Sequence, residues 1–236
     1  MLGLHPLDAS RALRTQQGIV WENLSREKAA ALASLLIETG FPSGLVPQHD
    51  VVKLAAKELC RNADVVEGGL EIEDGHGHKR LLHRDWFELA HVGWVKEQER
   101  SYRERTRAKI RIKTGARGDR RRQTVRVEES SAEEAGWVLN LFGHGDPSEW
   151  IQIHAPYFNY DYLPETPPSW REGFRLFMND LYAVIPGPKT DAGFRLALSL
   201  GACDTVPDAA KFPSVDDLDE RGRWALTILR TVGELA

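Results

Sequence analysis

The sequence has few cysteines and no long hydrophobic run. Only two cysteines, Cys60 and Cys203, occur among 236 residues. Without a cysteine-rich framework they are predicted to be buried thiols and not a disulfide. The N-terminal residues lack a basic stretch followed by a long apolar core, so no secretory signal is predicted. No window approaches the roughly 18 consecutive apolar residues of a membrane-spanning helix. These absences favour a soluble chain in the cytoplasm, with no transmembrane segment.

The motifs that identify common enzyme classes are also missing. There is no G-x-S-x-G elbow, and no G-x-x-x-x-G-K-[ST] loop for nucleotide phosphates. The G-x-G triplets at residues 75–77 and 143–145 lack the third glycine and the following helix of a dinucleotide site, so they are interpreted as turns. No catalytic residue and no cofactor is predicted, and the chain is expected not to be an enzyme.

Histidines and acids near one predicted hairpin are the best candidates for a metal site or for acid–base chemistry. His76, His78 and His83 lie where two imidazoles can share one face of a strand, but nothing completes a four-ligand set. A solvated polar turn is the favoured interpretation, and no metal site is predicted. The acids Glu71, Glu73 and Asp74 are interpreted as the solvent-facing side of a strand. A second group is interpreted as negative charge at a helix N-terminus: Asp216, Asp217, Asp219 and Glu220.

The composition is that of a globular protein with a sizeable core. Apolar residues make up 42% of the chain and charged residues 28%, close to the averages for globular domains. Residues 18–21 and 41–46 are short apolar runs typical of strands, and residues 25–38 have apolar positions at helical spacing, ended by Gly40. Residues 1–60 are therefore predicted to form a βαβ unit, half of a ferredoxin-like fold.

From Asp64 onward, short alternating segments separated by polar turns predict about seven strands in an antiparallel sandwich or partly open barrel. The expected strands are 69–73, 79–83, 86–95, 109–113, 124–128, 137–142 and 150–154. Phe158 and Tyr160 are expected to close this core.

Helical patterns dominate the last third of the chain. Residues 169–172 resemble a capping box that opens a helix with an apolar face, and further helices are expected at 191–200 and from 214 onward. The predicted fold class is α+β, in three parts: a βαβ module (1–60), a β domain with a closing helix (61–186) and a C-terminal helical extension (187–236).

The order of elements across residues 64–185, with the phrase from Gly69 to Trp86, resembles bacterial pleckstrin-homology and GRAM-like domains. The βαβ start is similar to small bacterial signal-transducing modules. The run Phe158–Leu163, with Arg223 and Trp224, also resembles a family of planctomycete-type bacteria that has no assigned activity. These resemblances imply a PH-like β domain and a bacterial origin, and they imply nothing about function.

One segment is strongly basic although the chain carries a net charge of −4. Between Lys96 and Arg126, thirteen lysines and arginines stand against four acids, a local charge of +9. Guanidinium groups on a hairpin loop suit oxyanions, because each donates two parallel hydrogen bonds. The predicted anionic-ligand site is Lys113, Arg117, Arg120, Arg121 and Arg122. The alternative is that the hairpin pairs with acidic surface of the same chain or stays solvated.

The leading functional hypothesis is a non-enzymatic adaptor that acts through contacts with an unidentified protein partner or by self-association. The alternative is a binder of nucleic acid or of an anionic lipid surface through the Arg-rich hairpin at 100–122. A third hypothesis, an enzyme of unrecognised type, would require a pocket in which His83 or His154 meets a carboxylate.

Overall fold

The computed structural model describes a mixed α+β fold built on two main sheets. In the parts described, no helix is both long enough and apolar enough to cross a membrane. The described residues are 22–40, 43–73, 77–96, 102–103, 127–128, 135–185, 189–200 and 206–232.

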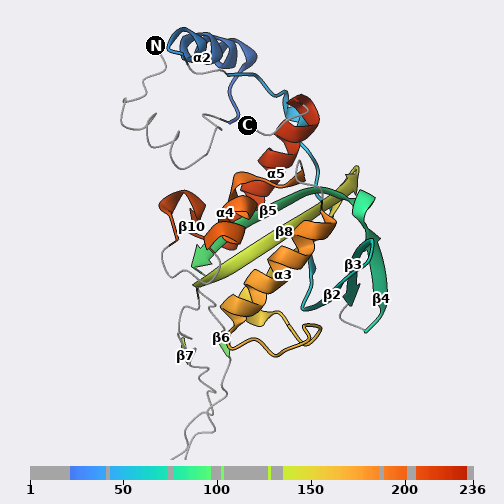
Figure 1. Ribbon diagram of the computed structural model, residues 1–236. Helices are drawn as coiled ribbons and strands as arrows, with labels where there is room; N and C mark the ends of the chain where they lie inside the picture. The colour runs from blue at the N-terminus through green and yellow to red at the C-terminus, as the bar shows by residue number, and fades with distance from the viewer. Residues whose placement is uncertain are drawn as a thin grey trace, which may run out of the picture.

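A five-stranded sheet forms the centre of the fold (Figure 1). Its three long strands, β5, β8 and β9, are antiparallel, and a two-residue strand pairs in parallel at each edge. The order is β1-β9-β8-β5-β10, with β1 at Glu58–Leu59, β5 at Phe87–Lys96, β8 at Ala135–Gly145, β9 at Ser148–His154 and β10 at Lys211–Phe212.

A smaller antiparallel sheet lies beside it and consists of β2 (Asn62–Val66), β3 (Gly69–Glu73) and β4 (Lys79–His83). Gly68 takes a φ of +89° in the two-residue turn between β2 and β3, a conformation that favours glycine. A separate ribbon pairs β6 (Tyr102–Arg103) with β7 (Val127–Glu128).

Helices cover both faces of the five-stranded sheet. In Figure 1, α3 crosses one face, α5 lies behind the strands, and α2 stands above α5 and apart from both sheets. The α-helices are α2 (Arg26–Glu38), α3 (Trp170–Val184), α4 (Ala192–Leu200) and α5 (Val215–Val232). Short 3-10 turns are η1 (Gln48–Asp50), η2 (Arg84–Trp86), η3 (Ala155–Tyr157) and η5 (Asp208–Ala210).

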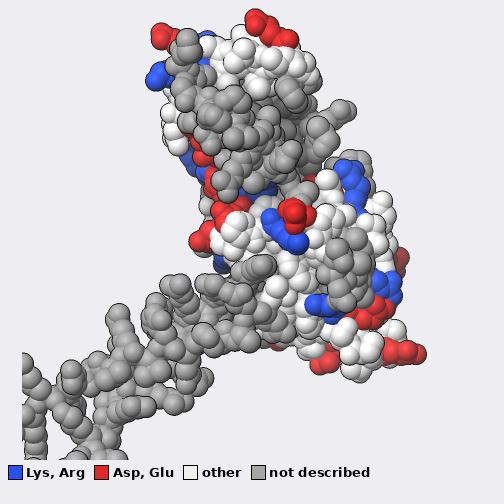
Figure 2. Space-filling view, turned by 90° about the vertical axis from the view of Figure 1, so that its left-hand side faces the viewer, with Lys and Arg blue, Asp and Glu red and all other residues white. Residues whose placement is uncertain are grey.

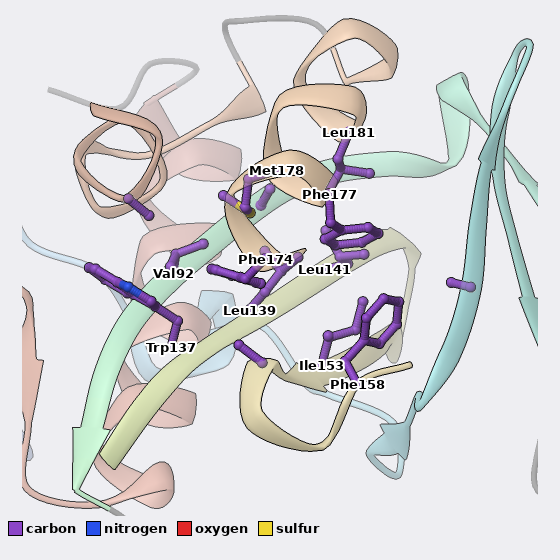
Figure 3. Close-up of a cluster of buried hydrophobic side chains, with 14 of the residues drawn as sticks. Val92, Trp137, Leu139, Leu141, Ile153, Phe158, Phe174, Phe177, Met178 and Leu181 are labelled. Carbon is purple, nitrogen blue, oxygen red and sulfur yellow. The ribbon is translucent and has the colours of Figure 1, made fainter. Parts of the chain in front are cut away.

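The α3 face of the sheet is apolar throughout and holds the largest core cluster. Ser169 begins α3 by accepting a hydrogen bond from the Glu172 amide at 3.3 Å, as a capping box predicts. Figure 3 shows the buried side of α3 against alternate residues of β5 and β8. The members of this core cluster include Phe174, Phe177, Met178 and Leu181 from the helix and Val92, Leu139 and Leu141 from the strands.

The other face receives α5. Leu218 packs with Val95, Val138 and Phe212, while Leu226 packs with Leu89, Phe142 and Trp150. Gly222 lies so close to the sheet that an added Cβ would stand 2.6 Å from the Phe142 ring. A side chain at this position would therefore push α5 away from the strands.

Most of the elements expected from periodicity are confirmed. The helices expected at 25–38, 169–185, 191–200 and from 214 onward match α2, α3, α4 and α5. The strands expected at 69–73, 79–83, 86–95, 137–142 and 150–154 match β3, β4, β5, β8 and β9.

Other expectations need correction. A strand was expected at 41–46, but its described part, residues 43–46, is irregular chain between α2 and η1 that pairs with no strand in the described ranges. The described strands do not close into a barrel, because the central strand β8 is buried on both faces and helices cover each. The expected strands at 18–21 and 109–113 lie outside the described residues, as does 124–126 of the strand expected at 124–128. The three-part division of the chain stays a prediction.

Two expectations about single residues are confirmed. Cys60 is a buried free thiol, and its burial raises the thiol pKa to about 12, so it is unreactive at neutral pH. Phe158 and Tyr160 are 5% and 8% exposed and belong to the core under α3. Cys203 lies outside the described residues.

Replacing Phe177 with alanine is expected to lower the free energy of unfolding by about 3–5 kcal/mol, because the fully buried ring would leave a cavity. Tyr182→Ala on the same helix, where the side chain is 47% exposed, should cost about 1 kcal/mol or less. Denaturant unfolding followed by circular dichroism measures both. Equal losses for the two variants would contradict the assignment of this core.

Candidate functional site

A row of polar side chains is buried between the five-stranded sheet and α5. His91, Asn140 and Gln152 are directly opposite one another on β5, β8 and β9, and they are 2%, 0% and 1% exposed. Alternate strand residues share one face, so all three point toward α5. Buried polar groups are costly unless they are hydrogen-bonded, so their partners define the site.

Asp219 of α5 binds the Asn140 and Gln152 end of this row. Its Oδ1 accepts hydrogen bonds from Asn140 Nδ2 at 3.0 Å and from Gln152 Nε2 at 2.7 Å. Its Oδ2 accepts from Lys57 Nζ at 2.9 Å. Gln152 Nε2 also donates to Asn140 Oδ1 at 2.9 Å, and its Oε1 contacts His154 Nε2 at 2.8 Å. The carboxylate is thus fully engaged by groups of the fold.

Asp191 binds the other end. One of its oxygens contacts His91 Nδ1, and the other accepts from the Phe194 amide at 2.8 Å, which caps the start of α4. Arg221 of α5 lies near the same carboxylate. Burial lowers the Arg221 pKa to about 10 against the opposing effect of Asp191, so the guanidinium remains charged at neutral pH.

An open cleft of about 1700 Å³ lies next to this layer, under α2. We call it the α2 cleft. One side is formed by α2, the floor by the outer side of α5, and the remaining walls by the chain at 43–54 and by residues of α4 and β10. Its apolar lining includes Leu24, Leu32, Leu36, Val46, Leu196, Trp224 and Ile228.

The α2 helix contributes to this cleft without being packed into the body of the fold. None of its side chains is buried. Ala29, Leu32, Ala33 and Leu36 follow the i, i+3, i+4, i+7 pattern of one helix face, and all four line the cleft with intermediate exposure. Glu22, just before the helix, accepts a hydrogen bond from the Trp224 indole and so joins this segment to α5.

His91 and Asp191 both line the α2 cleft. A histidine paired with a carboxylate is part of a catalytic triad, but His91 Nε2 is buried and has no hydrogen-bond partner. Thus no described nucleophile is bonded to it. Within the described ranges, no cluster of three or more His, Cys, Asp or Glu residues is placed to hold a metal ion.

The predicted site residues Lys113, Arg117, Arg120, Arg121 and Arg122 lie outside the described residues. Figure 2 shows basic and acidic side chains side by side on the described part of one face. Of the predicted metal candidates, His76 also lies outside the described residues, while His78 and His83 are on the exposed surface.

Sequence reasoning missed the residues that the structure brings together. Asp219 was interpreted as helix N-terminal charge, although it lies beside Leu218 on the buried side of α5. Asn140 and Gln152 interrupt the apolar runs at 137–142 and 150–153, and that interruption is the signal that identifies them. His91 and Asp191 are 100 positions apart, so their pairing has no local signature.

Asp219→Ala is expected to destabilise the fold by about 2–4 kcal/mol, because it leaves two buried amides and Lys57 without their acceptor. Asp216→Ala is the matched control, since Asp216 is an exposed acid in the first turn of the same helix and should cost less than about 1 kcal/mol. Denaturant unfolding provides the comparison. A loss no larger than that of the control would show that the polar row does not hold α5 in place.

Comparisons with protein families, with curated proteins and with solved structures found no significant match for this chain. The α2 cleft and the polar row are therefore the structural basis of the leading proposal.

Proposed function

We propose that this chain is a non-enzymatic binding protein that acts through protein–protein contacts, and that the α2 cleft receives a segment of its partner. The observation that carries this proposal is the unburied apolar face of α2. In this proposal the protein is a bacterial adaptor of the cytoplasm, and the strands from β2 onward form the PH-like part suggested by sequence.

The energetics of α2 support a partner. A helix of 13 residues is only marginally stable in water on its own, and most helical stability in proteins comes from packing of an apolar face. The face of α2 with Leu32 and Leu36 is only partly covered. A partner that covers this face would remove apolar surface from water and stabilise the helix at the same time.

The size of the cleft supports a peptide-like partner. Small-molecule pockets usually enclose roughly 300–1,000 Å³, and the α2 cleft is larger, at about 1700 Å³. It is bounded by two helices, α2 and α5, whose cleft-facing sides are mostly apolar. This geometry fits the helix-in-groove mode, in which an amphipathic segment inserts apolar side chains into a hydrophobic groove.

Selection of a displayed random-peptide library against the full chain tests this proposal. Enriched peptides should carry apolar residues at helical spacing, and their affinity should fall about tenfold or more on Leu32→Asp, which places a charge inside the cleft. The affinities can be measured by fluorescence titration.

Leu35→Asp is the matched control, because Leu35 lies on the same helix, is 54% exposed and does not line the cleft. Its affinity should stay near that of the unchanged chain. The proposal fails if no peptide is enriched, or if both aspartate variants weaken binding equally while remaining folded by circular dichroism.

A second candidate function follows from the charge of the sequence. The +9 segment from Lys96 to Arg126 favours binding of nucleic acid or anionic lipid through Lys113, Arg117, Arg120, Arg121 and Arg122. Such binding should weaken steeply with salt in assays with DNA, RNA or anionic vesicles. Replacing Arg117, Arg120, Arg121 and Arg122 with alanine should abolish it. Salt-independent binding, or binding that survives the four substitutions, would reject this function.

A further inference from the structure

We infer that the segment bound in the α2 cleft is an acidic amphipathic one, with Asp or Glu side chains beside its apolar anchors. This inference rests on the proposed function, because it specifies the chemistry of the partner for that cleft. The evidence for it is the set of charged side chains that line the cleft, together with the hydrogen bonds and ion pairs that these side chains already form.

Cations outnumber acids among the described lining residues. Four cationic side chains, Arg26, Lys53, Arg221 and Arg223, stand against two acids, Glu22 and Asp191. The acids are already engaged: Glu22 accepts from the Trp224 indole, and Asp191 is bonded to His91 and to the start of α4. The Lys, Arg, Asp and Glu side chains of the lining therefore carry a net charge of +2, and each of the two acids already accepts a hydrogen bond.

Two of the cations are available to a ligand. Within the described ranges, Arg26 and Lys53 form no ion pair and no side-chain hydrogen bond, and both are exposed at the cleft. An incoming carboxylate would gain charge-assisted hydrogen bonds there without breaking existing ones. These contacts would contribute chiefly to selectivity and to the rate of association.

The other two cations are partly buried in the floor. Arg223 donates to Glu220, and its Nε is buried without a partner. Burial already lowers the pKa of Arg221, so a second anion near this guanidinium, in addition to Asp191, would favour its charged form. An acidic partner would thus add a favourable charge interaction to two guanidinium groups that are partly buried in the floor.

The distribution of charge along the two helices matches an amphipathic segment. On α5, Arg221, Trp224, Ala225 and Ile228 follow the i, i+3, i+4, i+7 pattern and form one stripe of the floor. On α2, Arg26 precedes the apolar stripe through Ala29 and Ala33 to Leu36. In each stripe an arginine, Arg221 or Arg26, lies at the N-terminal end and is followed by small and apolar side chains. Acidic side chains at the ends of a bound segment would therefore lie near these arginines.

The N-terminal residues of the same chain are a poorer match for the cleft. Residues 1–21 carry Arg11 and Arg14 against the single acid Asp8, a net charge of +1. That sign opposes the cationic lining. Charge complementarity therefore favours a separate acidic partner, and the chain's own N-terminal sequence serves as a competitor in the test.

Two synthetic amphipathic peptides of about 15 residues, long enough for partial helicity, test the inference. Both carry leucines at i, i+3, i+4 and i+7; one has glutamates at the flanking positions and the other has glutamines there. On the full chain, the glutamate peptide should bind about tenfold tighter than the glutamine peptide at roughly 0.05 M ionic strength. This difference should shrink at roughly 0.3 M, where surface charges are screened.

The double variant Arg26→Ala/Lys53→Ala should lose most of the preference for glutamate. Arg195→Ala is the matched control, because Arg195 is an exposed arginine of α4 outside the cleft lining, and it should keep the preference. All of these substitutions are at exposed positions, so the variants should remain folded.

The outcomes separate this inference from the proposed function. If the two peptides bind equally to the cleft, as judged by loss on Leu32→Asp, the cleft binds segments but does not select acids, and the inference fails alone. If a peptide of residues 1–21 binds better than the glutamate peptide, the occupant is the chain itself and the inference is overturned. If no peptide binds the cleft, both this inference and the proposed function fail.

Discussion

Directional polar contacts hold α5 on the sheet: Arg230 donates to both carboxylate oxygens of Glu88, and Asp219 binds the buried polar row. Asp219 accepts from Asn140, Gln152 and Lys57, so it joins the helix to two neighbouring strands and to the chain that precedes β1. Apolar contacts alone would tolerate sliding or rotation of a helix on a sheet, because they are not directional. A shared acceptor with three donors fixes one register. Since the outer side of α5 is the floor of the α2 cleft, the shape of the cleft depends on this buried interaction.

The two faces of the sheet perform different tasks. The α3 face contains a continuous apolar cluster, which accounts for most of the hydrophobic burial. The α5 face alternates apolar contacts at Leu218 and Leu226 with the polar row between them. Buried polar networks add less to stability than apolar packing of the same volume, and their value lies in the arrangement they select. The α5 face therefore provides orientation, and the α3 face provides stability.

Sequence periodicity predicted those parts of the fold that depend on local pattern. The apolar stripes of α3 and α5 and the alternation in β3 and β9 repeat within a few residues, so they are visible without any tertiary information. The edge strands β1 and β10 are two residues each and exist only because β9 and β5 provide partners. The same reason applies to the error at residues 43–46, an apolar run that pairs with no strand of the described part of the chain. The cleft was not predictable, because it is formed by residues from distant parts of the chain.

Two acids of the site hold helices of the fold in place. Asp219 is engaged by contacts that hold α5, and Asp191 caps the start of α4 and contacts His91. The apolar face of α2 and the cations Arg26 and Lys53 line the cleft, as does His91, whose Nε2 has no hydrogen-bond partner among the described residues. A partner that covered this apolar surface would remove it from water, which lowers the free energy of the complex. The polar row fixes the floor and α2 forms a wall of the cleft, and in the proposed function a partner segment would provide the packing that α2 lacks.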